Sequence, residues 1–205
     1  MACTRQGAEV WPSFPVGGQS LRRALQVKPS VVRAIPSMST EGAPSLETAA
    51  IIKVALEAGT LSHHKVITWA DRHIATATEP PSWLLDVSLS GDAAALIEAL
   101  RLADPEASVP LATEARLYLH IEAAAIEVKN ALPAVEAAFD LAVRHGLATE
   151  WRERVFEIDR HLTICLEGGR DGSEVMPSLV RFRDDLLRLS SDSRKAQRIV
   201  HECQE

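Results

Sequence analysis

The side chains best suited to catalysis in this chain are histidines and carboxylates in segments with helical periodicity. Glu157 and His161 are four residues apart, so a helix would place them on one face. His73 and His120 occupy two other segments of the same kind. A histidine and a carboxylate from separate helices could converge in a pocket and act as acid and base. The candidate catalytic residues are therefore His73, His120, Glu157 and His161.

Metal binding and covalent catalysis have little support in the sequence. It contains no His-Glu-x-x-His, Glu-x-x-His or Cys-x-x-Cys motif, so we expect no metal ion and no other cofactor. Cys165 follows His161 by one helical turn, but its place on an apolar stripe predicts a small core residue rather than a nucleophile. The glycine-rich run 168–172 lacks the preceding strand that a phosphate-binding loop requires.

Trp69 and Trp83 are the candidate binding residues. They flank a corner formed by Pro80 and Pro81. We expect the two indoles to pack together in the core and to fix the angle of that corner. The alternative is that one of them lines a groove, where an exposed indole would anchor a partner.

The charge distribution favours a protein partner. The formal net charge is -6, yet residues 45–205 carry 26 acids against 17 cations, whereas residues 1–44 carry two acids and five cations. An acidic surface repels the phosphates of nucleic acids and of anionic membranes. It attracts basic proteins. We therefore expect a protein partner of basic character, and neither nucleic acid nor a membrane.

The cysteine content favours the cytoplasm. Three widely spaced cysteines do not make a disulfide framework, and a reducing compartment keeps them as thiols. No stretch approaches the roughly 18 to 20 apolar residues that span a bilayer. We expect a cytoplasmic protein, most simply a bacterial one.

The elements that must position these side chains are all helices. Between residues 45 and 190, apolar residues recur every three or four positions, and glycine and proline stand at the junctions. The predicted helices are 45–58, 62–75, 82–88, 92–103, 113–131, a sixth ending at 145, 149–166 and 177–189. Pro133 either kinks the fifth helix or opens the sixth. We expect an all-α fold, a compact bundle or stack of seven to eight helices.

Two apolar stripes predict the core of this single helical domain. One stripe follows 4-3-4-3 spacing and consists of Trp151, Val155, Ile158, Leu162 and Cys165. The other lies on the fifth predicted helix and includes Leu117, Ile121, Ala124 and Val128. The short loop around Gly146 predicts that helices six and seven are antiparallel neighbours, with the fifth close by. The alternative is that the first stripe is an interface with a partner.

The two ends of the chain differ from the domain at 45–190. Residues 1–44 contain nine glycines and prolines and no periodicity, which predicts an irregular or disordered tail. This tail is a targeting peptide, an interaction arm, or a start-site artefact with translation beginning at Met38; we favour an artefact or an inert tail. Residues 191–205 read as a polar C-terminal tail, either weakly helical or frayed.

These features favour a non-enzymatic helical protein-interaction module with an acidic surface, similar in build to immunity, adaptor or regulator proteins. The alternative is a small-molecule-binding protein or enzyme with a histidine and carboxylate pocket between helices. A third hypothesis is a component of a larger assembly that docks through its N-terminal arm. They differ in whether two or more of the four candidate side chains converge in a concave pocket with perturbed pKa values.

Overall fold

The computed structural model describes residues 44–104 and 110–205. The chain divides into two units, residues 1–39 and 40–205, and every described residue belongs to the second. The expected irregular tail at 1–44 therefore lies outside the described residues, apart from its last position.

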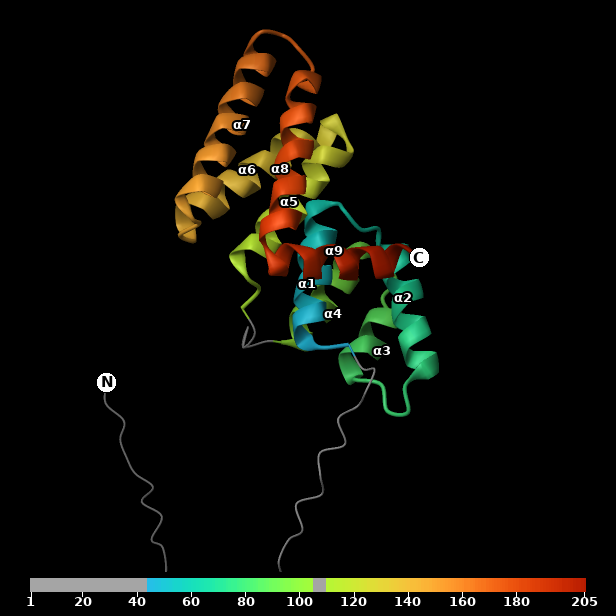
Figure 1. The fold of residues 1–205 in the computed structure, drawn as a ribbon. Coiled ribbons are helices and arrows are strands. Elements are labelled where there is room, and N and C mark those ends of the chain that lie inside the picture. The colour runs from blue at the N-terminus through green and yellow to red at the C-terminus, as the bar shows by residue number, and fades with distance from the viewer. Residues whose placement is uncertain (1–43, 105–109) are drawn as a thin grey trace, which may run out of the picture. The chain divides into compact units, whose positions relative to one another are not determined.

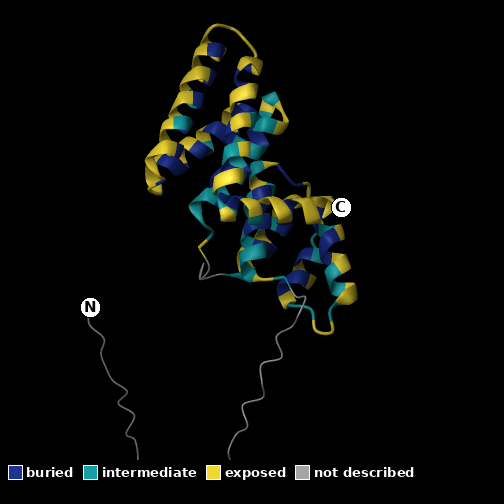
Figure 2. Cartoon of the chain, viewed as in Figure 1, coloured by how far each residue is buried: buried dark blue, intermediate teal, exposed yellow. Residues whose placement is uncertain are grey.

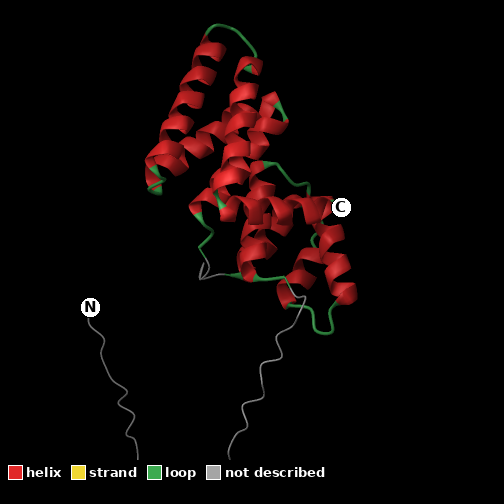
Figure 3. Cartoon of the chain, viewed as in Figure 1, coloured by secondary structure: helices red, strands yellow, loops and turns green. Residues whose placement is uncertain are grey.

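The described residues form nine α-helices and one short 3-10 helix, and they contain no strand (Figures 1 and 3). The predicted all-α fold is confirmed. The elements are α1 (Leu46–Ala58), α2 (His63–Thr76), α3 (Ser82–Ser88), α4 (Ala93–Ala103), α5 (Thr113–Ile126), α6 (Val128–Arg144), α7 (Thr149–Glu167), η1 (Ser173–Val175), α8 (Met176–Leu189) and α9 (Ser191–Gln204).

Local signals place most helix ends where the sequence predicts them. The Ser45 side chain accepts a hydrogen bond from the backbone N–H of Thr48, and Asp92 accepts one from Ala95 in the same way. Such caps satisfy backbone donors that have no partner in the first turn. Gly59 ends α1 with a φ of 83°, in the left-handed region that favours glycine.

The boundary between α5 and α6 differs from the prediction. The sequence places a break at Pro133, but the chain turns at Glu127, whose φ of -141° and ψ of 132° are extended. Pro133 lies inside α6. A proline has no backbone N–H, and its ring crowds the carbonyl of the preceding helical turn. Pro133 therefore costs α6 one backbone hydrogen bond, but it does not end the helix.

Of the two alternatives for the C-terminal tail, helical or frayed, the structure shows the helical one: residues 191–204 form α9, which packs against α1, α2, α5 and α8 (Figure 1). Its sequence is mostly polar, but a narrow stripe is buried. The buried residues are Ser193, Ala196, Ile199, Val200 and Cys203.

Side chains of α2 hold the C-terminal end of α9. Lys65 Nζ donates to the carbonyl of Gln204 at 2.7 Å, and Arg72 Nη2 donates to the carbonyl of Glu202 at 2.9 Å. Cations at this end of a helix complement its dipole and satisfy carbonyls that lack intrahelical partners. Long-range contacts therefore stabilise a helix that its own sequence supports only weakly.

Helix α5 lies in the middle of the packing and contacts α1, α6, α8 and α9. The predicted stripe on α7 is buried at all five positions, as are Leu117, Ile121 and Ala124 on α5. Figure 2 shows buried positions alternating with exposed ones along the helices. Helix α6 contacts both α5 and α7, as the short loop predicts. Ile158 is only 5% exposed, so the α7 stripe belongs to the core and is not an interface.

Candidate functional site

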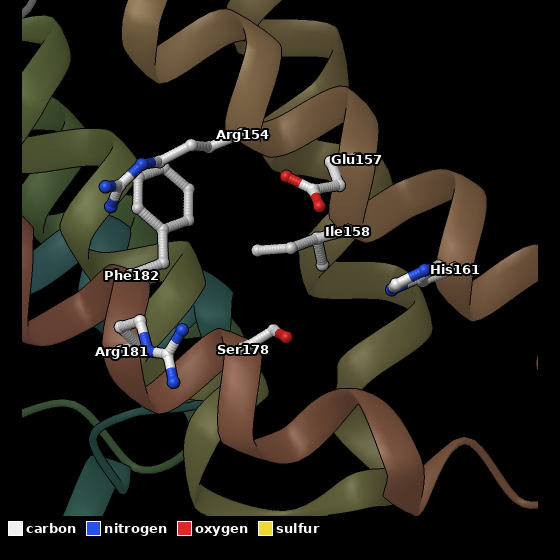
Figure 4. Close-up of a pocket in the computed structure, with 7 residues that line it drawn as sticks. All are labelled: Arg154, Glu157, Ile158, His161, Ser178, Arg181 and Phe182. Carbon is white, nitrogen blue, oxygen red and sulfur yellow. The ribbon is translucent and has the colours of Figure 1, made fainter.

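Glu157 and His161 line one cleft between α7 and α8. The cleft has a volume of about 180 Å³. Its walls are Arg154, Glu157, Ile158 and His161 from α7, and Ser178, Arg181 and Phe182 from α8 (Figure 4). Glu157 enters from the α7 side and Ser178 from the α8 side, with His161 at one end.

An aromatic and ionic contact closes the other end of this cleft. Trp151 and Phe182 stack with their ring centroids 5.7 Å apart. The Arg154 guanidinium lies 5.8 Å from each of these rings, and its Nη1 donates to Asp185 Oδ2. Hydrogen bonds from Arg154 and Arg188 hold the pKa of the Asp185 carboxyl below its usual range. Arg154 therefore joins α7 to α8.

The polar groups of the α7–α8 cleft do not form a proton relay. In the described part of the chain, Glu157, His161 and Ser178 make no side-chain hydrogen bond or ion pair with one another. General acid and base catalysis needs such groups within hydrogen-bonding reach of each other or of a substrate. The volume is also below the roughly 300 to 1,000 Å³ of ordinary ligand pockets. Glu157 and His161 also line a second hollow, of about 370 Å³, on α7.

His73 and Trp69 meet a carboxylate that the sequence did not single out. Trp69 Nε1 donates to Glu202 Oε1 at 3.1 Å, and His73 Nε2 lies 2.8 Å from the same oxygen. Glu202 belongs to α9, so this cluster attaches α9 to α2. Its role is structural, because Trp69 is only 1% exposed.

The two candidate binding tryptophans lie in the core. Trp69 and Trp83 are both buried, with ring centroids 6.4 Å apart and planes inclined by 28°. The expected packing at the proline corner is what the structure shows. Neither indole is presented to a partner.

His120 lies apart from the other candidates. It lines a hollow of about 310 Å³ with Glu57 at the end of α1 and Asn130 and Pro133 in α6. Burial lowers the pKa of His120, and the nearby Arg116 guanidinium lowers it further. His120 therefore favours its neutral form and has no carboxylate partner among the described residues.

A larger groove lies between α5 and α9, at residues that the sequence did not indicate. Its volume is about 640 Å³. Its lining residues are Tyr118 and Glu122 from α5, and Arg194, Gln197, Arg198, Val200, His201 and Gln204 from α9. Burial raises the pKa of the Glu122 carboxyl, against a smaller opposing effect of Arg183. Burial also raises the pKa of Tyr118, the only tyrosine of the chain.

The sequence contained one signal for this groove. Tyr118 and Glu122 are four residues apart and share a face of the predicted fifth helix. The opposite wall could not be predicted, because α9 was expected to be a tail.

An apolar stripe also lies on the outer side of the α6–α7 hairpin. We call Leu132, Phe139, Val143 and Phe156 the α6–α7 stripe. Their exposed fractions are 42%, 37%, 58% and 37%. The rings of Phe139 and Phe156 are in contact, with centroids 4.9 Å apart. The three α6 members recur at spacings of seven and four, so they share one side of that helix.

Two other kinds of site were sought among residues 44–104 and 110–205. No helix there is long and apolar enough to cross a membrane. No group of three or more His, Cys, Asp or Glu side chains in these ranges could hold a metal ion.

Comparison with known proteins finds no matching family model, no matching curated protein and no matching solved structure. The function must therefore be argued from the residues themselves.

Proposed function

We propose that this chain is a non-enzymatic helical protein-interaction module, of the immunity, adaptor or regulator kind. It binds a basic protein partner through the α6–α7 stripe. The observation that carries this proposal is the contacting pair Phe139 and Phe156, each 37% exposed on the outside of the hairpin. Half-exposed aromatic rings that are already held in place make good anchors for a partner, because little conformational freedom is lost on binding.

The charges of the α6–α7 hairpin favour a basic partner. Within the described residues, six acids of the segment 128–167 make no side-chain hydrogen bond or ion pair: Glu136, Glu150, Glu153, Glu157, Asp159 and Glu167. Within the described residues, only two arginines of that segment also make no side-chain hydrogen bond or ion pair: Arg152 and Arg160. The hairpin as a whole therefore carries a surplus of unpaired acids, which attracts a basic segment.

The separation of the candidate catalytic residues supports a non-enzymatic role. His73 lies at the α2–α9 contact, His120 lies in the hollow beside α1 and α6, and only Glu157 and His161 share a cleft. Two of the four candidates therefore share a cleft, but in the described part of the chain Glu157 and His161 make no hydrogen bond or ion pair with each other, so they do not form an acid–base pair. The acidic α6–α7 hairpin gives better support for the proposed protein-interaction function.

The cysteines agree with a cytoplasmic location, which remains part of the proposal. Cys165 and Cys203 are both free and buried. Burial raises the pKa of the Cys203 thiol to about 12, which makes it unreactive. The fold does not depend on a disulfide at either of these cysteines, so it does not need an oxidising compartment to be stable.

Site-specific photo-crosslinking tests the proposal. The photoreactive amino acid p-benzoylphenylalanine would replace Phe139 in one version of the full chain and Leu89 in another, both expressed in the native host. Leu89 is the matched control, because it is 83% exposed and lies at the end of α3. We expect ultraviolet light to join position 139, and not position 89, to a partner segment with a net positive charge. Mass spectrometry identifies that segment.

Three outcomes would overturn the proposal. Crosslinking at position 139 could be no stronger than at position 89. The captured segment could be acidic, or it could belong to a second copy of this chain. As an independent check, Phe139→Asp should abolish the crosslink from a second reporter at Phe156 while the circular dichroism spectrum stays helical.

A further inference from the structure

The groove between α5 and α9 is large enough for an ordinary small molecule. Its volume of about 640 Å³ exceeds the 180 Å³ of the α7–α8 cleft. It falls within the roughly 300 to 1,000 Å³ of known ligand pockets. Tyr118 and Val200 supply buried apolar surface, and the other lining side chains are polar or charged.

The α5 wall of the groove carries a carboxylate that lacks hydrogen-bond donors. Glu122 Oε2 is buried and accepts no hydrogen bond from the described residues. Arg183 Nε lies 3.6 Å away, but Arg183 donates instead to Asp184, at 3.0 and 2.8 Å. The Glu122 side chain remains 21% exposed. The exposed part of this carboxylate lines the groove, where a bound donor can reach it.

The α9 wall carries cations. Arg194 and Arg198 are four residues apart, on one side of the helix. His201 lies on the same side, and its Nε2 is 3.5 Å from Glu205 Oε1. Arg194 is held in place, because its Nη1 donates to the carbonyls of Leu187 and Arg188 at 3.0 and 3.1 Å. The Arg198 guanidinium has no hydrogen-bond or ion-pair partner in the described part of the chain, so it is available to an anion.

The two walls do not neutralise each other. Among the described residues, no ion pair joins Glu122 to Arg194, Arg198 or His201. The nearest cation to Glu122, on Arg183, lies on α8 and not on α9. The groove therefore presents separated negative and positive ends, and a ligand with the reverse arrangement would match both.

We infer that the α5–α9 groove binds a small zwitterion, an amine that also carries a carboxylate or a phosphate. Its ammonium group donates to Glu122, and its acid group binds Arg198. This binding is separate from the protein contact proposed for the α6–α7 stripe, because the two regions share no residue.

Tyr118 provides a reporter inside the groove. It is the only tyrosine of the chain, so incorporation of 3-fluorotyrosine labels one position and gives one fluorine NMR signal. The full chain labelled in this way would be titrated with O-phosphoethanolamine and with γ-aminobutyrate. The matched probes ethyl phosphate and butyrate carry the acid group without the amine. We expect a saturable shift with both zwitterions and binding at least about fivefold weaker for the matched probes.

Two variants test the two ends of the ligand. Glu122→Gln keeps the shape of the side chain and removes its charge, so zwitterion affinity should fall about tenfold, to the level of the matched probes. Affinity for the matched probes should not fall. Arg198→Gln should weaken zwitterions and matched probes alike, by about three- to fivefold. The control is Arg181→Gln in the α7–α8 cleft, which should change nothing.

The inference is overturned if neither zwitterion shifts the Tyr118 signal at millimolar concentration. It is also overturned if Glu122→Gln leaves the preference for an amine intact. Circular dichroism checks that each variant is folded. Arg198 is exposed, so Arg198→Gln should fold even if Glu122→Gln does not, and unchanged affinity for zwitterions and matched probes in that variant also overturns the inference.

Discussion

Glu202 joins two residues that the sequence offered as separate candidates. Its carboxylate accepts the indole N–H of Trp69 and lies in hydrogen-bonding contact with His73. A buried indole N–H without an acceptor would be costly, so this carboxylate stabilises the packing of α9 on α2. Histidine and carboxylate side chains can act in catalysis, but here they stabilise the contact between two helices.

His120 should make stability depend on pH. Its pKa is lowered in the folded protein by burial and by Arg116, so the unfolded chain binds a proton more readily. The free energy of unfolding should therefore fall as the pH drops below about 6.5, the usual value for histidine. We expect His120→Gln to weaken this fall between about pH 7 and pH 5, measured by urea unfolding. The exposed His64→Gln is the control, and an equal effect of the two variants would contradict the prediction.

Glu122 should act in the opposite direction. Burial raises the pKa of its carboxyl, so the folded state binds a proton more readily than the unfolded chain. Stability from this residue is present at low pH and is lost as the pH rises through the raised pKa. Glu122→Gln should therefore increase the free energy of unfolding at neutral pH by about 1 kcal/mol. The gain should vanish below about pH 4.5, the usual value for glutamate.

A matched variant separates burial from the loss of a charge. Glu136→Gln removes an acid that is exposed on α6 and that makes no ion pair within the described residues. It should leave stability nearly unchanged at both pH values. A gain equal to that of Glu122→Gln would mean that the net charge of the protein, and not the burial of Glu122, is responsible.

At the scale of elements, the connection from α7 to η1 depends on Gly172. Its φ is 80°, and a Cβ at this position would lie 2.9 Å from Cδ1 of the buried Leu162. Gly59 has nearly the same φ, 83°, but open space around it. Gly59→Ala should therefore cost about 1 kcal/mol, from backbone strain alone. Gly172→Ala should cost about 1 kcal/mol more, because Leu162 must shift.

Thermal or urea unfolding of the two alanine variants measures this difference. Equal losses would show that Leu162 moves without cost. A larger loss for Gly59→Ala would contradict the geometry of the loop. Because the loop joins the two walls of the α7–α8 cleft, Gly172→Ala is also expected to alter the environment of His161, which NMR can follow.

The helix α9 shows how an element can depend on its neighbours. Most of its residues are polar, and its buried stripe is narrow. Its ends are held by other elements: Lys195 pairs with Glu47 of α1, and α2 caps the C-terminal carbonyls. In proteins most helical stability comes from such tertiary contacts and not from intrinsic propensity.

At the scale of the whole molecule, residues 1–37 should add little to stability. Their sequence has no apolar stripe to bury. A chain that begins at Met38 should therefore melt at nearly the same temperature as the full chain and give the same helical circular dichroism. A loss of more than about 2 kcal/mol, the scale of one or two buried side chains, would show that Trp11 or Phe14 packs on the domain.

The sequence by itself determined the helical class and most of the helix ends. Ser45 and Gly59 bound α1 through contacts within a few residues, and the 4-3-4-3 stripe of α7 follows directly from helical geometry. It also brought Glu157 and His161 to one cleft, because a spacing of four residues is a local property.

The tertiary structure decided what lies far apart in sequence. Helix α9 packs against four other helices, and no local pattern reports those contacts. Glu122 and Arg198 face one groove although α5 and α9 are separated by three helices. The packing of the other helices buries Glu122, which raises the pKa of its carboxyl. The same packing leaves the aromatic pair of the α6–α7 stripe partly exposed. The sequence identifies these side chains, but it does not show how deeply each is buried or which groups lie beside it.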